Sequence, residues 1–162
     1  MVAQKMKPTI TITGTRKYPR LDLVAKIVEE LLPPQCNIIT GNTQGVETTV
    51  IQRTCWPDKP LHQLTVIPTN WTQYRKAAIH IKNLEMLSRS QILIAFTHNN
   101  QLEELICEAN RRNILVYEYD KTGHLKQDQP FLFQPDHSLY LPDMSGHEFN
   151  PDTEGAILNR YL

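Results

Sequence analysis

The chain has 162 residues, 40% hydrophobic and 21% charged, and its 17 basic and 17 acidic residues give a formal net charge of zero. This length and composition are ordinary for one globular domain, and the neutral balance counts against nucleic acid as a partner because nucleic-acid binders usually carry a basic excess. No apolar run approaches the roughly 20 residues of a membrane helix and no secretory leader is apparent, so we expect a cytoplasmic protein without a membrane partner.

Strand and helix patterns alternate along most of the chain. In chain order we expect a strand at 9–13, a helix at 21–32, a strand at 36–40, a helix at 46–54, a strand at 61–67, a helix at 74–88, a strand at 91–96, a helix at 102–110 and a strand at 114–119. About five strands separated by helices predict an α/β fold, a Rossmann-like doubly wound parallel sheet with helices on both faces.

The regular pattern ends after residue 120. We therefore expect residues 1–120 to form the Rossmann-like domain. Residues 121–162 hold several prolines and scattered aromatic residues, which predicts a largely irregular C-terminal arm packed on that domain or on a partner subunit. A homo-oligomer is the expected assembly, since the arm and the outer helical faces need surfaces to pack on.

Two of the expected strands end at glycines. Ligands of open α/β sheets bind outside the carboxyl ends of the strands. Glycine turns with free N–H groups, nearby cations and a helix N-terminus suit an anion. The alternative is that the first segment is an ordinary turn with solvated basic residues, and that Glu47 is only an acidic residue in the first turn of a helix, where it interacts favourably with the helix dipole. The candidate ligand-binding residues at these two ends are Gly14, Thr15, Arg16, Gly41, Asn42, Thr43, Gly45 and Glu47.

A third polar segment follows the apolar strand at 91–96. His98 and Asn99 could hydrogen-bond a sugar or base, and Glu103 or Glu104 could hold a ribose hydroxyl or act at an anomeric carbon. The alternative is a polar loop that caps the next helix, with its carboxylates near the positive end of the dipole.

Aromatic and basic residues mark the segment before and within the helix at 74–88. Trp71 and Tyr74 could stack on a base, and Lys82 with Asn83 could reach a phosphate, although packing would explain the aromatic residues equally well.

The cysteines and histidines lack metal-ligand spacing. Cys36, Cys55 and Cys107 form no CxxC pair and the six histidines are dispersed, so we expect neither a metal site nor a cofactor. We interpret Cys36 and Cys107 as buried thiols.

In this order, the segments resemble the SLOG superfamily, over about residues 8–118. That superfamily includes the LOG-type nucleoside-monophosphate phosphoribohydrolases and the DNA-processing protein A fold, and the resemblance is closest to its small single-domain bacterial and phage members. The matching motifs are Gly14-Thr15-Arg16, Gly41 to Glu47, Trp71 to Ala78, and Lys82-Asn83 to Met86.

The sequence departs from the LOG enzymes at two places. Their glycine-rich phosphate loop is replaced by His98 to Leu102, where side chains would obstruct close backbone approach to a phosphate. Lys82 stands where those enzymes carry an arginine, which removes the bidentate fork. The resemblance also aligns Glu104 with their catalytic glutamate when a one-residue gap is allowed.

The expected function is therefore binding, by sensing or sequestering, of a nucleotide-derived small molecule such as a nucleoside phosphate, an ADP-ribose derivative or a cyclic signalling nucleotide. The alternative is an N-glycosidic-bond hydrolase of the LOG type, in which Glu104, or else Glu103, stabilises the oxocarbenium-like centre or acts as nucleophile. A second alternative is single-stranded DNA binding, by analogy with DNA-processing protein A.

Overall fold

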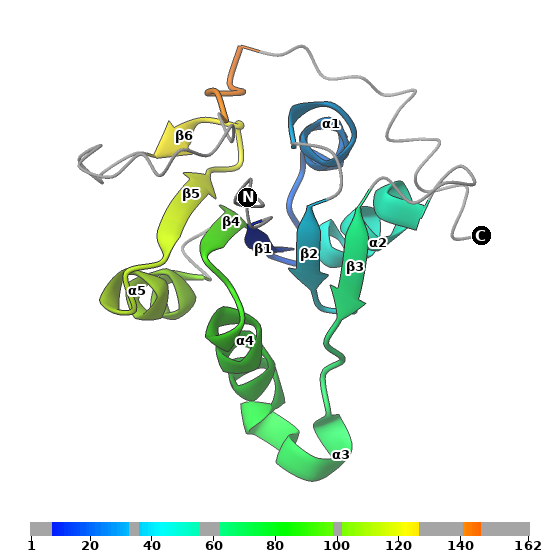
Figure 1. Cartoon of the computed structure of the whole chain (residues 1–162), viewed down its shortest axis with the longest axis vertical. Coiled ribbons are helices and arrows are strands. Elements are labelled where there is room, and N and C mark those ends of the chain that lie inside the picture. Colours follow the sequence, from blue (N-terminus) through cyan, green and yellow to red (C-terminus); the bar gives the residue numbers. More distant parts are fainter. Residues whose placement is uncertain (1–7, 33–35, 56–61, 99–101, 127–140, 147–162) are drawn as a thin grey trace, which may run out of the picture.

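The computed structural model of the chain describes residues 8–32, 36–55, 62–98, 102–126 and 141–146 (Figure 1). Its strands are β1 (Thr9–Gly14), β2 (Asn37–Thr40), β3 (Gln63–Val66), β4 (Ile92–Phe96), β5 (Leu115–Tyr119) and β6 (Leu125–Lys126). Its α-helices are α1 (Leu21–Lys26), α2 (Val46–Cys55), α3 (Trp71–Tyr74), α4 (Ala78–Ser88) and α5 (Glu103–Arg111).

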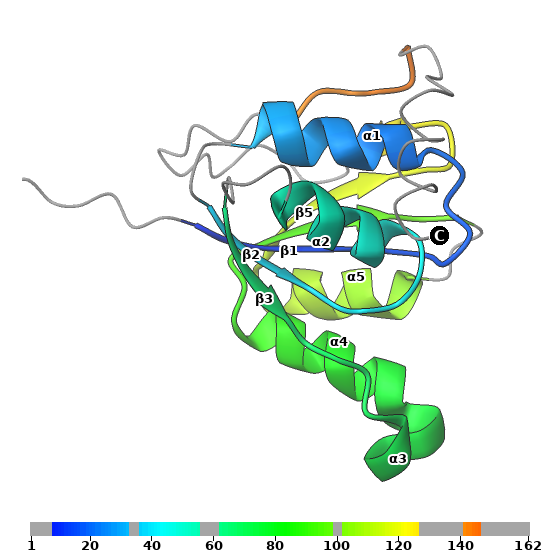
Figure 2. The same cartoon turned by 90° about the vertical axis from the view of Figure 1, so that its right-hand side faces the viewer.

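These strands form one sheet in the order β3-β2-β1-β4-β5-β6, in which β1 to β5 are parallel and β6 pairs antiparallel with β5. Helices α1 and α2 cover one face and α4 and α5 cover the other (Figure 2). The predicted doubly wound parallel sheet with helices on both faces is confirmed. Its strand order reverses between β1 and β4, the place where such sheets bind ligands.

Three elements differ from the expected ones. The helix expected at 21–32 ends in a π-helical turn, Ile27–Leu31, and the helix expected at 74–88 is divided. It begins early because the Asn70 side chain accepts a hydrogen bond from the Gln73 amide at 3.0 Å, and it breaks at Arg75, whose φ is 50°. The sixth strand was missed because it follows a tight turn, in which Gly123, with a φ of 86°, donates to the Asp120 carbonyl.

The central strand β1 has two chemically different faces. Ile10 and Ile12 are fully buried in the core cluster that includes residues of α1 and α2. Thr11 and Thr13 point to the opposite face, where the Thr11 hydroxyl donates to the Met86 carbonyl of α4 at 3.3 Å. The hydroxyl group of Thr11, at the middle of the sheet, therefore connects α4 to the strand.

An aromatic stack connects β4, β5 and the described part of the C-terminal arm. The ring of Phe96 stacks on Tyr119 at 5.3 Å, and Tyr18 meets Phe96 edge-on at 5.2 Å. The Tyr119 hydroxyl donates to the Pro142 carbonyl at 2.8 Å, and Met144 nearby is fully buried. Within residues 141–146, the arm therefore packs on the core of its own domain.

The two interpreted thiols differ in exposure. Cys36 is buried, as expected, but Cys107 is exposed on α5, so that interpretation is wrong for Cys107. Its neighbours Leu105 and Ala109 lie four residues apart on the buried face of the helix, and residue 107 falls on the opposite side. None of the helices in the described part of the chain is long and apolar enough to cross a membrane.

Replacing Tyr119 by Phe tests the hydrogen bond to the arm, because the ring is kept and only the hydroxyl is lost. We expect the free energy of unfolding at pH 8 to fall by about 1 kcal/mol. Burial raises the pKa of the Tyr119 hydroxyl in the folded protein. Just above pH 10, about the ordinary pKa of a tyrosine, this hydroxyl therefore ionises only in the unfolded chain. The wild type should therefore lose stability as the pH rises past about 10, and the variant should lose less.

Denaturant unfolding at pH 8 and above pH 10 measures both effects. Tyr117→Phe is the matched control at pH 8, because Tyr117 is also buried but no hydrogen bond of its hydroxyl occurs among the described residues. An unchanged stability of Tyr119→Phe at pH 8 would contradict the docking of the arm through this bond.

Candidate functional site at the carboxyl edge of the sheet

The loops that follow β1 and β2 meet at the carboxyl edge of the sheet. Gly45, directly before α2, has a φ of 99°, a conformation that side chains disfavour. The Arg16 carbonyl oxygen lies 2.7 Å from the position that a Cβ on residue 45 would occupy. Gly45 is thus required for this close approach, which brings Arg16 beside the N-terminus of α2.

A buried ion pair lies at the same edge. The Lys82 ammonium of α4 donates to the two carboxylate oxygens of Glu47 in α2, at 2.9 and 3.2 Å. The side chains are 3% and 0% exposed. Because α2 and α4 cover opposite faces of the sheet, this pair connects the two helical layers across the strand ends.

The Glu47 carboxylate also accepts hydrogen bonds from three other residues. The Thr13 hydroxyl donates to it at 2.9 Å, the Gly41 amide at 3.0 Å and the Thr43 amide at 3.1 Å, and the Thr43 hydroxyl donates as well. A Cβ on residue 41 would stand 2.4 Å from a Glu47 oxygen, so the glycine makes room for the carboxylate. This carboxylate is therefore fully hydrogen-bonded by the protein itself.

This arrangement engages three of the candidate residues in contacts within the protein. Glu47 and Lys82 satisfy each other's charge, so neither presents a free charge to a ligand. The space beside Gly41 is filled by the chain's own atoms. The ligand-binding role of these three residues stays a prediction. In the structure, Glu47 and Lys82 form the buried ion pair and Gly41 makes room for the Glu47 carboxylate.

The remaining candidates at this edge are more open. Gly14 ends β1 in register with Phe96 of β4, and Arg16 after it is exposed. Asn42 is exposed and Thr43 half-buried in the loop before α2. Together with Gln44, which is exposed, and Gly45, which is half-buried, these residues form the part of the edge that a solute can reach, whereas Val46 and Glu47 at the start of α2 are buried.

Thr15 is the buried member of this edge. It is 4% exposed, its amide donates to the Phe96 carbonyl at 3.1 Å, and its hydroxyl has no hydrogen-bond partner in the described part of the chain. Buried hydroxyl groups usually have a partner, so this one marks a place where the protein alone leaves a polar group unsatisfied.

The loop after β4 is described only in part. The Thr97 amide donates to the Tyr119 carbonyl at 2.8 Å, and His98 is half-buried. Asn99 lies outside the described residues. Glu103 and Glu104 are exposed in the first turn of α5.

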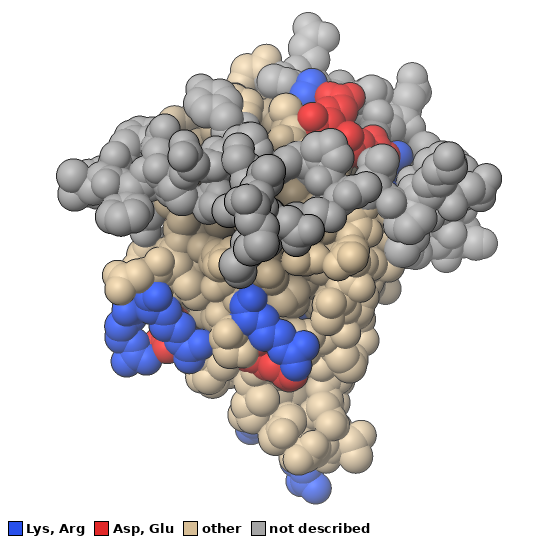
Figure 3. Space-filling model, in the orientation of Figure 1, with Lys and Arg blue, Asp and Glu red and all other residues tan. Residues whose placement is uncertain are grey.

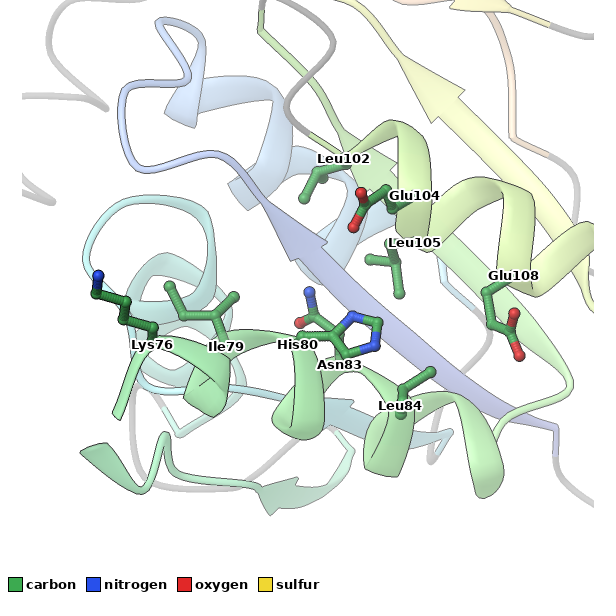
Figure 4. A pocket seen from close by; sticks show the side chains of 9 residues that line it. All are labelled: Lys76, Ile79, His80, Asn83, Leu84, Leu102, Glu104, Leu105 and Glu108. Atoms are coloured by element: carbon green, nitrogen blue, oxygen red, sulfur yellow. The ribbon is translucent and has the colours of Figure 1, made fainter. Parts of the chain in front are cut away.

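Glu104 lies in a different place from the ion pair. A groove of about 250 Å³ between α4 and α5 is lined by Glu104 and Leu105 from α5 and by His80 and Asn83 from α4. In Figure 4 the side chains of these two helices face each other across the groove. Lys82 instead lines a second groove on the side of α4 nearest β3, of about 390 Å³. Neighbouring residues of α4 thus face different cavities.

The two aromatic candidates lie on α3. Tyr74, 38% exposed, lines the second groove together with Lys82. Trp71 is 54% exposed, and α3 projects beyond the sheet at the end of α4 (Figures 1 and 2). No described contact brings these rings to Arg16 or to Gly45.

The sequence interpretation missed the roles of Thr13 and Tyr18. Thr13 donates to Glu47, and the Tyr18 hydroxyl donates to the Asp120 carbonyl at 2.6 Å, which fixes the loop after β1. The alternation of threonine with isoleucine in β1 was the available signal, because a hydroxyl face on a central strand requires polar partners.

Comparisons with protein-family models, with curated proteins and with solved structures find no match for this chain. Within the described ranges, no three histidine, cysteine, aspartate or glutamate side chains are grouped as a metal ion would require. The interpretation of function therefore depends on the geometry of the carboxyl edge.

Replacing Lys82 by Met tests whether the buried pair holds the edge together. We expect the free energy of unfolding to fall by about 3–5 kcal/mol, because a buried carboxylate would lose its counter-charge. Arg89→Met is the control, since Arg89 pairs with Glu85 at 3.3 Å but both side chains are half exposed, and it should change stability by less than about 1 kcal/mol.

The double variant Glu47→Gln/Lys82→Met should be less destabilised than the sum of the two single variants, because the two charges are coupled. Urea unfolding of the four proteins measures this coupling. A Lys82→Met variant as stable as Arg89→Met would contradict the structural role of the pair.

Proposed function

We propose that this chain binds a nucleotide-derived small molecule at the carboxyl edge of its sheet, beside the reversal of strand order between β1 and β4. The phosphate of the ligand lies at the start of α2, next to Arg16. Parallel sheets of this topology bind ligands outside the reversal, and a helix N-terminus offers free N–H groups and a favourable dipole to an anion.

The observation that carries this proposal is the approach of Arg16 to Gly45. The backbone carbonyl of Arg16 approaches Gly45, directly before the ten-residue helix α2, in a contact that only glycine permits, so an exposed arginine stands in the loop that meets this helix N-terminus. Arginine matches a phosphate with two parallel hydrogen bonds, so the pair supplies both charge and direction. The unpartnered hydroxyl of Thr15, in the same loop, supports a ligand at this edge.

The neutral parts of the ligand would meet amide and hydroxyl groups. Asn42, in the loop before α2, can donate to a ribose hydroxyl, and the Thr43 hydroxyl oxygen, whose proton is donated to Glu47, can accept from one. The motif order shared with the SLOG superfamily supports the same ligand class, namely a nucleoside phosphate, an ADP-ribose derivative or a cyclic signalling nucleotide.

The geometry gives less support to N-glycosidic-bond cleavage. Lys82, which would neutralise the substrate phosphate, is already neutralised by Glu47. Glu104, the proposed catalytic carboxylate, lines the α4–α5 groove, which Lys82 does not line. We therefore propose that the protein binds the nucleotide-derived ligand without cleaving it.

Arg16→Ala should weaken binding of a nucleoside phosphate by about 10- to 100-fold, since it removes a charge-assisted contact. Calorimetry against nucleoside mono- and diphosphates, ADP-ribose and cyclic nucleotides measures this, with the corresponding nucleosides as phosphate-free controls. Arg89→Ala removes an equal charge directly after the end of α4 and should leave the affinity unchanged.

The same samples report on catalysis when they are assayed for released base. Absence of binding by every nucleotide at millimolar concentration would refute the proposal. Base release that Glu104→Gln abolishes would support the hydrolase instead.

A further inference from the structure

The strand β3 forms one edge of the sheet, and no other strand in the described part of the chain pairs with its outer side. The Gln63 amide donates to the carbonyl of the residue before β2 at 2.9 Å, and the Ile67 amide donates to the carbonyl at the end of β2 at 2.8 Å. Because backbone groups alternate in direction along a strand, the N–H and C=O groups of Leu64 and Val66 point away from β2. These groups are available to a further strand.

The opposite edge of the sheet is closed by the chain itself. At β6 the Leu125 amide donates to the Asp143 carboxylate of the arm at 3.1 Å, and the second residue of this two-residue strand is a lysine. Short strands, charged side chains and covering segments are the usual protection of sheet edges. By contrast, β3 has four residues and none of them is charged. In Figure 3 the described surface on the right-hand flank, where Figure 1 shows β3, is uncharged.

The second groove lies beside this edge, between β3 and α4. From α4 and the residue directly after it, the groove is lined by Ala78, Ile81, Lys82, Glu85 and Arg89. These residues recur at intervals of three or four or are adjacent, so they form one stripe along the helix. The stripe is about 16 Å long at 1.5 Å per helical residue, which corresponds to about five residues of an extended chain. The groove therefore has room for the side chains of an added strand.

The groove offers apolar surface and few free charges. Val66 of β3 and Tyr74 of α3, each 38% exposed, line it together with Ile81. Its two cations, Lys82 and Arg89, are each paired with a glutamate. A phosphate group would therefore gain little here, whereas an apolar side chain would cover exposed hydrophobic surface.

We propose that the β3 edge and the second groove bind an extended segment of another protein as an additional strand. The backbone of this segment bonds to the outward groups of Leu64 and Val66, and every second side chain, which is apolar, enters the groove against Tyr74 and Ile81. In this mode of recognition the main-chain hydrogen bonds supply affinity, and pockets for alternate side chains supply specificity. The inference does not depend on the proposed nucleotide site.

The side chains of β3 argue against a second copy of this chain as the occupant. Ile67 packs with Met86 of α4, so by alternation Gln63 and Thr65 lie on the same face of the sheet as the groove. A second copy that paired antiparallel through its own β3 would place these two polar side chains on the groove face. A segment with apolar residues at alternate positions complements the groove better.

Peptide selection on the full chain tests the proposed occupant. Short random peptides are selected on the wild type and counter-selected on Val66→Lys, because lysine on an edge strand opposes pairing. We expect peptides that are enriched on the wild type alone and that carry apolar residues at every second position. Fluorescence anisotropy of the tightest synthetic peptide should show at least about tenfold weaker binding to Val66→Lys.

Ile79→Lys is the matched control, because Ile79 is 40% exposed but lines the α4–α5 groove instead. This variant should bind the peptide as the wild type does, and circular dichroism melting shows whether both variants are folded.

Methylation of single peptide amides tests the backbone pairing. Only every second amide of an added strand faces β3. Methylation should therefore weaken binding at least about tenfold at alternate positions and have little effect at the positions between them.

The proposal would be overturned by a selection without peptides that prefer the wild type to Val66→Lys, by an equal loss of binding in Ile79→Lys, or by methylation effects without alternation. A wild type that sediments as a dimer, and that Val66→Lys converts to a monomer, would also overturn it and assign the edge to a second copy.

Discussion

The carboxylate of Glu47, at the start of α2, crosses the carboxyl edge of the sheet to meet the ammonium of Lys82 on α4, on the opposite face. Two charges with almost no exposure require near-complete hydrogen bonding to offset their loss of hydration. The Thr13 hydroxyl and the amides of Gly41 and Thr43 supply it. The ends of β1 and β2, and the helices on both faces, are therefore held in place by one carboxylate.

This constraint decides which parts of the edge remain available to a ligand. Groups committed to the ion pair hold the scaffold rigid, and rigid support is what a binding site on loops requires. The loop after β1 remains open, with Arg16 held beside the N-terminus of α2 through Gly45. The proposed site recognises an anion by position and charge, whereas Glu104, a candidate carboxylate for catalysis, lines the α4–α5 groove, which Lys82 does not line.

The sequence was sufficient for the architecture because strand and helix periodicities alternate, and because Ile92–Phe96 is apolar throughout, as a central strand covered on both faces must be. It also located the glycines at the strand ends. It could not show what fills the space beside them, since Lys82 lies 35 positions from Glu47 and only the fold brings them together. The exposure of α3 was equally hidden, because Trp71 and Tyr74 are residue types that usually pack inside.

The most direct test of this account is a nuclear magnetic resonance titration of the ¹⁵N-labelled chain with a nucleoside monophosphate. If the phosphate binds at the start of α2, the amide signals of residues 14–17 and 44–48 shift first and most, because these residues surround the start of α2 beside Arg16. Shifts confined to residues 76–84 and 102–108, which form the α4–α5 groove, would contradict it.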